Sequence, residues 1–78
     1  MDRIKQILMD LHPEEDYDSS SDFVMDGILD SFDIITLVTE LEDAFDVKID
    51  GRDILPENFS SLENIRKMLE KNGVKSEF

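Results

Sequence analysis

Cysteine and tryptophan are absent from the 78 residues, and the chain contains only three glycines, two prolines and one histidine. The absence of cysteine excludes disulfides and thiolate metal sites, and it suits a reducing compartment. No apolar run approaches the roughly 18 residues of a membrane-spanning helix, and the first residues are too charged for a signal peptide. We therefore expect a cytoplasmic protein without a membrane span. Because the chain starts at Met1 and ends soon after its last expected helix, we also expect it to be free-standing.

Basic residues are missing from the middle of the chain. The formal net charge is −12, from twenty acidic and eight basic residues. Twelve of the acids lie between Glu14 and Asp46, a segment that contains no Lys or Arg. This concentration of charge argues against nucleic-acid binding, because carboxylates repel phosphates. It favours rapid association with basic partner proteins.

Apolar residues recur at steps of three and four, which is the period of one helical face. The spacing predicts helices over about 2–11, 31–45 and 61–71, with a short helical segment over about 52–59. We therefore expect an all-α fold, a small bundle of three long helices and one short helix, formed by one domain over residues 1–78.

The segments between these helices carry turn and capping signals. In the loop over 12–29, the residues expected to anchor in the core are Tyr17, Phe23 and Met25. Ser60 with Glu63 three residues later matches a capping box for the last helix. Glycine is favoured just past the end of a helix, so Gly73 is expected to stop the last helix. The tail over 74–78 is expected to be loose.

The stretch from Gly27 to Phe32 introduces the most regular of the expected helices. Asp30 is expected to cap the helix, which places Ser31 in the first turn with its hydroxyl free to face solvent. The positive end of the helix dipole favours a phosphate group at this place. An Asp–Ser pair alone is an ordinary capping signal, so the register of the following residues matters. The apolar stripe of this helix begins at Phe32 and continues through Ile35, Val38, Leu41 and Phe45, and the last four are interpreted as core packing.

The beginning of this helix reads Leu29-Asp30-Ser31-Phe32-Asp33, and it is followed by Leu37-Val38, Leu41-Glu42 and Phe45-Asp46. Together with Val47-Lys48-Ile49 and residues 54–65, this arrangement closely resembles the modification-site helix of the acyl carrier protein family. The resemblance implies that a transferase attaches 4'-phosphopantetheine from coenzyme A to Ser31, which Asp30 flanks. It also implies a thioester carrier of acyl or aminoacyl groups, without catalytic activity of its own.

The resemblance further implies partners and a docking face. The expected partners are a phosphopantetheinyl transferase, an acyl- or aminoacyl-loading ligase, and synthase or transferase enzymes with basic docking patches; the carrier itself is expected to be a monomer. Phe32 replaces the family's usual leucine, and Thr36 stands where an acid is common, so we favour a specialised carrier. The docking face is expected to consist of Phe32, Asp33, Thr36, Thr39, Glu40 and Asp43.

No independent catalytic or metal-binding constellation accompanies Ser31. The single histidine, His12, is interpreted as a helix-end residue near the negative pole of the helix dipole. The acidic run from Asp16 to Asp22 is superficially similar to a calcium loop, but Ser21 stands at the glycine position and Gly27 at the glutamate position. We expect neither catalytic residues nor a metal site.

Several functions stay open at the level of sequence. The cargo could belong to fatty acid biosynthesis, to other lipid metabolism or to a polyketide pathway. It could equally be aminoacyl, D-alanyl or peptidyl. A more distant alternative is an acidic helical adaptor that binds a basic protein partner without modification, in which Ser31 serves only as part of a helix cap.

Overall fold

The computed structural model describes residues 3–75, and all regular structure within that range is helical. The three α-helices are α1 (Arg3–Leu11), α2 (Ser31–Phe45) and α3 (Leu62–Lys71), and the two 3-10 turns are η1 (Gly51–Asp53) and η2 (Pro56–Phe59). The predicted all-α class is confirmed. The predicted fourth helix is not, because the segment over 52–59 forms two separate 3-10 turns. Residue 2, where the first helix was expected to begin, and residues 76–78 lie outside the described part.

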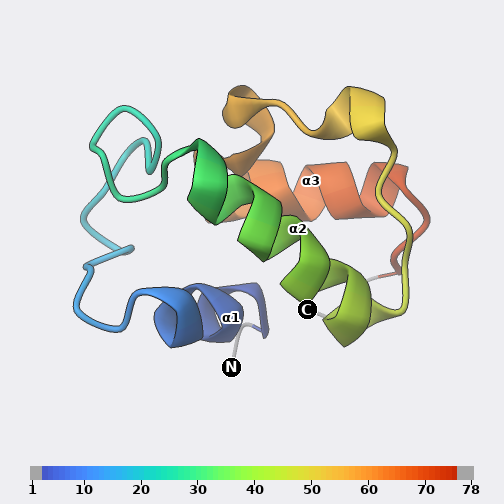
Figure 1. Cartoon of the computed structure of the whole chain (residues 1–78), viewed down its shortest axis with the longest axis horizontal. Helices are drawn as coiled ribbons and strands as arrows, with labels where there is room; N and C mark the ends of the chain where they lie inside the picture. The colour runs from blue at the N-terminus through green and yellow to red at the C-terminus, as the bar shows by residue number, and fades with distance from the viewer. Residues whose placement is uncertain (1–2, 76–78) are drawn as a thin grey trace.

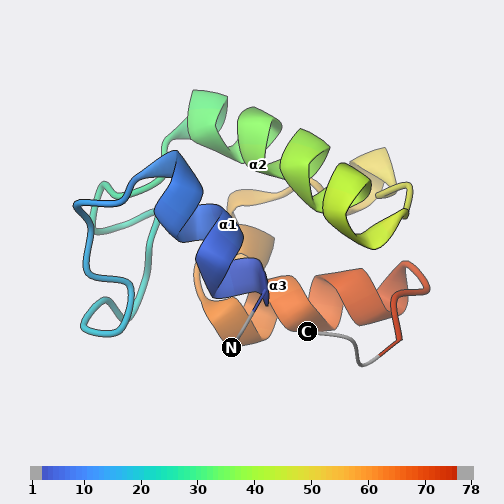
Figure 2. The same ribbon diagram turned by 90° about the horizontal axis from the view of Figure 1, so that it is seen from below.

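Helix α2 lies across α1 and α3, and the long loop between α1 and α2 occupies one side of the molecule (Figure 1). Seen from below, α2 runs along the top of the molecule and α3 along the bottom, and α1 crosses obliquely between them (Figure 2). Helix α1 packs against α2 and α3, and η2 packs against both α2 and α3. None of the helices within residues 3–75 is long and apolar enough to cross a bilayer.

Contacts at both ends show that α1 and α2 run antiparallel. At one end, the Arg3 guanidinium donates to the Ala44 carbonyl and lies 4.4 Å from the centre of the Phe45 ring. At the other end, His12 lies 3.1 Å from Asp33 in the first turn of α2. The start of α2 is therefore tied to the end of α1.

The core is formed by the apolar faces of the three α-helices, together with buried apolar residues from the loops. In α2 the buried residues are Ile34, Leu37, Val38 and Leu41. Ile35 was expected in this stripe and is 64% exposed. The expectation was wrong because the inward row of α2 runs through Ile34, one residue earlier. The largest fully buried side chains are Phe23, Phe59, Ile4, Leu8, Leu29, Leu37, Leu41, Ile65 and Leu69.

Two of the three expected loop anchors are buried. The Tyr17 hydroxyl donates to the Leu8 carbonyl over 2.7 Å, and its ring packs edge-on against Phe23 with 5.3 Å between ring centres. Met25 was wrongly expected in the core, since it is 82% exposed. The Asp22 carboxylate accepts the Met25 N–H over 3.0 Å and forms a tight turn that directs this side chain outward.

The ends of α3 are set by local hydrogen bonds. Ser61 is the N-cap, because its hydroxyl accepts the Asn64 N–H over 3.1 Å. The capping box expected at Ser60 was wrong by one residue, and the Ser60 hydroxyl instead donates to the Glu57 carbonyl over 2.9 Å. Phe23 also donates its N–H to the Ser60 carbonyl over 2.8 Å, which joins the long loop to the start of α3.

The predicted stop at the end of α3 is confirmed. Gly73 has a φ of +100°, and its N–H donates to the Glu70 carbonyl while the Val74 N–H donates to the Leu69 carbonyl. This pair of bonds is a Schellman motif, which requires a left-handed residue where glycine is favoured. Val74 is only 9% exposed, so the tail expected to be loose from this residue is packed at its first position.

A buried carboxylate joins η1 to the end of α3. The Asp53 side chain is 10% exposed and accepts from Lys71 Nζ over 2.7 Å and from Asn72 Nδ2 over 3.0 Å. The bond from Lys71 has the largest effect and the bond from Asn72 the next largest, and together they hold the pKa of Asp53 below its usual value. Since a buried polar group is costly when unpaired, this cluster fixes the segment that leads to η2, beside the start of α2.

Candidate functional site

Ser31 is the first residue of α2, and its side chain is exposed. The expected N-cap at Asp30 is confirmed. Its carboxylate accepts the Asp33 N–H over 2.8 Å, and the Asp33 carboxylate accepts the Asp30 N–H over 3.2 Å. This reciprocal capping box fixes the backbone on both sides of Ser31. Because Asp30 does the capping, the Ser31 hydroxyl is not needed for it.

His12 contacts this first turn through the side chain of Asp33, and the sequence analysis did not predict this contact. Its Nε2 atom lies 3.1 Å from Asp33 Oδ2, and its Nδ1 atom lies 3.7 Å from Glu14 Oε1. The contact with Asp33 raises the pKa of His12 above 6.5, against the opposing effect of burial. Burial alone would raise the pKa of Asp33, but His12 and the Asp30 N–H hold it below its usual value. His12 and Asp33 are distant in sequence, so no local pattern revealed the contact.

An apolar hollow adjoins Ser31. It has a volume of about 240 Å³ and is lined by Ser31, Ile34, Ile35, Ile54 and Pro56. Ile35 reaches this opening from α2, while Pro56 approaches from the first position of η2. The exposed serine hydroxyl therefore stands at the edge of an apolar surface.

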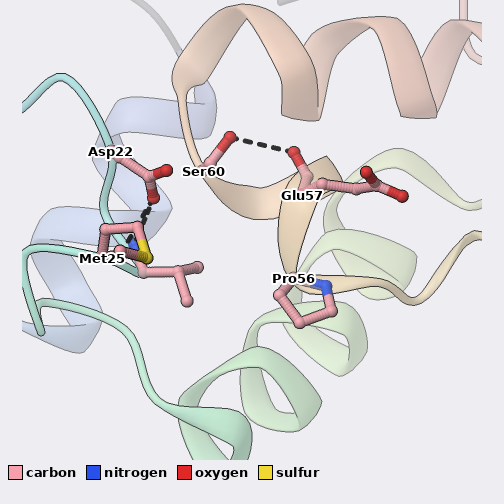
Figure 3. A pocket seen from close by; sticks show the side chains of 6 residues that line it. Asp22, Met25, Pro56, Glu57 and Ser60 are labelled. Atoms are coloured by element: carbon pink, nitrogen blue, oxygen red, sulfur yellow. Dashed lines mark hydrogen bonds between the residues drawn. The ribbon is translucent and has the colours of Figure 1, made fainter.

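A second hollow lies on the other side of Pro56, between the long loop and η2 (Figure 3). Its volume is about 210 Å³, and the Asp22–Met25 and Ser60–Glu57 hydrogen bonds shape its walls. Within residues 3–75, Pro56 is the one residue that lines both hollows.

A family model described as a phosphopantetheine attachment site matches residues 2–69, which include α1, α2 and most of α3. The chain belongs to this family. Comparison with curated proteins and with solved structures gave no significant match. The prosthetic group of the family is 4'-phosphopantetheine, which is bound covalently.

The residues around Ser31 fit this phosphopantetheine group. An exposed hydroxyl is available for a phosphodiester bond, and the positive end of α2 favours the phosphate charge. The neighbouring hollow is largely apolar, which suits the arm or the chain that it carries. When bound, the group supplies a thiol at the end of a flexible arm.

The docking face expected for this phosphopantetheine carrier is partly polar and partly apolar. Thr39, Glu40 and Asp43 are exposed along α2, and Phe32 is 74% exposed beside Ser31. The Thr36 and Thr39 hydroxyls donate to the carbonyls one turn earlier, over 3.2 and 3.4 Å. Asp33 differs from the others, because its side chain is turned toward His12 and is 17% exposed.

Acidic side chains of the long loop accept hydrogen bonds from neighbouring residues of the same loop. Asp16 accepts the backbone N–H groups of Asp18 and Ser19 over 3.1 and 3.2 Å, and the Ser19 hydroxyl over 2.7 Å. The bonds from Ser19 hold the pKa of Asp16 below its usual value. Among residues 3–75, no group of three or more acidic, histidine or cysteine side chains is arranged to hold a metal ion.

Proposed function

We propose that this chain is a carrier protein that holds acyl or aminoacyl groups as thioesters on a phosphopantetheine arm attached to Ser31. The observation that carries the proposal is the exposed Ser31 hydroxyl in the first turn of α2, with the capping role filled by Asp30. Attachment forms a bond between Ser31 Oγ and the 4'-phosphate of the pantetheine half of coenzyme A. The bond within its pyrophosphate breaks, and adenosine 3',5'-bisphosphate leaves.

The protein's own contribution is presentation of the serine. The reciprocal hydrogen bonds between Asp30 and Asp33 fix the backbone of the first turn, and the buried Ile34 and Leu37 hold the next turn against the core. A rigid attachment point with a flexible arm lets one carrier deliver its cargo to several enzymes. We propose that it acts without catalytic activity of its own.

Charge and apolar surface support transient partner binding at α2. The segment from Glu14 to Asp46 has twelve acids and no base, which favours rapid association with basic docking patches. Phe32 and Ile35 add exposed apolar contacts next to the serine. We propose that the phosphopantetheinyl transferase, the loading ligase and the synthase or transferase enzymes use Phe32, Asp33, Thr36, Thr39, Glu40 and Asp43.

The direct test is intact mass after incubation with coenzyme A, magnesium and a broad-specificity phosphopantetheinyl transferase. The parent protein should gain one arm, and the Ser31→Ala variant should gain none. Ser21→Ala is a matched control, because Ser21 is also exposed but lies in the loop, and this variant should gain one arm. If the folded parent gains no arm with several transferases, the unmodified acidic adaptor becomes the better account.

The cargo is identified by the loading enzyme. An adenylating ligase active on the modified protein would indicate an amino or carboxylic acid, including D-alanine or a peptidyl chain. A ketosynthase would indicate chain building in fatty acid or polyketide synthesis. The replacement of an acid by Thr36 and of leucine by Phe32 leads us to propose a specialised carrier.

A further inference from the structure

The end of α1 is held in a defined position beside the first turn of α2. The His12 N–H donates to the Leu8 carbonyl over 2.9 Å. The His12 carbonyl accepts from the Tyr17 hydroxyl over 3.2 Å and from the Glu15 N–H over 3.3 Å. Because the backbone is anchored on both sides, the imidazole is fixed against Asp33 over 3.1 Å.

The contact is an ion pair more than an aligned hydrogen bond. His12 Nε2 is buried and makes no hydrogen bond of normal geometry within the described residues, although Asp33 Oδ2 lies next to it. The side chains of His12 and Asp33 are 29% and 17% exposed, so the pair is partly shielded from water. Such a contact stabilises the imidazolium form and is weakened when the ring is neutral.

Within residues 3–75, the charged groups that act on the His12 ring are all acidic. Asp33 approaches from α2, and Glu14 and Glu15 approach from the loop, while the Tyr17 phenol lies beside the same group of acids. Burial raises the pKa of Tyr17 to about 12, so this phenol stays neutral near pH 7. The surroundings therefore favour a protonated His12.

Asp33 connects His12 to the backbone next to Ser31. The same Oδ2 atom that faces His12 accepts the N–H of Asp30, the residue directly before Ser31. We propose that His12 is a positioning residue for Ser31: its imidazolium holds the Asp33 carboxylate in the capping box, and loss of its proton loosens the first turn of α2. The proposal rests on the proposed function only in treating Ser31 as the modified residue.

The direction of the pH effect follows from the pKa of His12, which the fold raises above 6.5. A raised pKa means that the contribution is complete below pH 6.5 and is lost as the pH rises through the folded-state value. The first turn should therefore be best ordered on the acidic side of neutrality. Asp33 stays ionised throughout this window, because its own pKa is lowered.

The first experiment follows the unmodified protein by NMR between pH 5.5 and 8.5. The His12 ring and the amides of Ser31 and Asp33 should titrate with one shared midpoint above 6.5. In His12→Gln, which is neutral at every pH, that titration of the amides should vanish. Asp33→Asn should return the His12 midpoint toward 6.5. A parent midpoint at or below 6.5, or amide titration that persists in His12→Gln, would overturn the proposal.

Hydrogen exchange measures the loosening itself. Below the midpoint, the amides of the first turn of α2 should exchange about two- to fivefold faster in His12→Gln than in the parent, as expected for loss of one ion pair at the protein surface that is partly shielded from water. Above the midpoint the two proteins should exchange at the same rate. The Ile65 amide in α3 is the internal control and should not differ. Equal exchange of the first turn at every pH would contradict the proposal.

The second experiment compares the modification rates of the parent and His12→Gln with one transferase at each pH. The ratio of the two rates cancels the pH dependence of the transferase. The rate of the parent divided by the rate of His12→Gln should exceed one below the His12 midpoint and fall to one above it. A ratio that is constant with pH would mean a merely structural role. If neither protein gains an arm, the proposed function fails, while the NMR result still decides the role of His12.

Discussion

Two consecutive isoleucines of α2 provide a sharp test of the packing. Ile34 is 6% exposed and lies in the core, whereas Ile35 is 64% exposed and lines the hollow beside Ser31. Replacing either residue by alanine removes the same atoms from neighbouring positions of one helix. The difference between the two changes in the free energy of unfolding therefore isolates the effect of burial.

The structure sets the size of that difference. Ile34→Ala should cost about 2–4 kcal/mol, because it removes a buried side chain and leaves a cavity. Ile35 is about one-third covered, and full burial of isoleucine contributes about 1.5–3 kcal/mol, so its truncation should cost about 0.5–1 kcal/mol. The higher helix propensity of alanine offsets about 0.4 kcal/mol of this. Ile35→Ala should thus change stability by less than about 0.6 kcal/mol.

Urea denaturation followed by circular dichroism measures both changes. With a slope of about 1 kcal/mol per molar urea for a small domain, the midpoint should fall by about 2 M or more for Ile34→Ala. For Ile35→Ala it should fall by less than about 0.6 M. Equal shifts, or a larger shift for Ile35→Ala, would refute the packing of α2 described above. Ile35→Ala should in addition slow modification of Ser31, because a contact beside the serine is lost.

Three further predictions concern the capping box and the charges. Asp30→Ala should lower the free energy of unfolding by about 1 kcal/mol in urea denaturation, and an unchanged midpoint would contradict the capping role. Arg52 lowers the pKa of Asp50 to about 2, and the pKa values of Asp33 and Asp53 are also lowered, so the melting temperature should fall as the pH drops from about 4 toward 2. A flat profile there would be inconsistent with these contacts. Added salt at neutral pH should raise the melting temperature by screening the clustered acids, whereas a melting temperature independent of salt would count against self-repulsion.

Local patterns predicted the helices well, because the spacing of apolar residues and the capping residues are encoded within each segment. The helix expected over 31–45 is α2, with Asp30 as its cap, and the stop at Gly73 is a Schellman motif. The exposed position of Ser31 follows from the same local geometry. These features depend on neighbours within four or five residues.

The errors arose where distant segments decide the environment. Ile34 and Ile35 both fit an apolar helical stripe, and only the positions of α1 and η2 determine which one is buried. Met25 is an exception, because the cause is local: the turn at Asp22, three residues earlier, directs this apolar side chain to solvent. The contact between His12 and Asp33 joins two helices across a long loop, so neither residue signals it in its own segment.

Top-down mass spectrometry of the protein isolated from its own cells tests directly whether Ser31 carries the arm. We predict a phosphopantetheine arm located on Ser31, with part of the population carrying an acyl group that hydroxylamine cleaves from the thioester as a hydroxamic acid, leaving the free thiol. The mass of that acyl group would identify the cargo. A population that is unmodified at Ser31, or an arm located on another residue, would contradict the account.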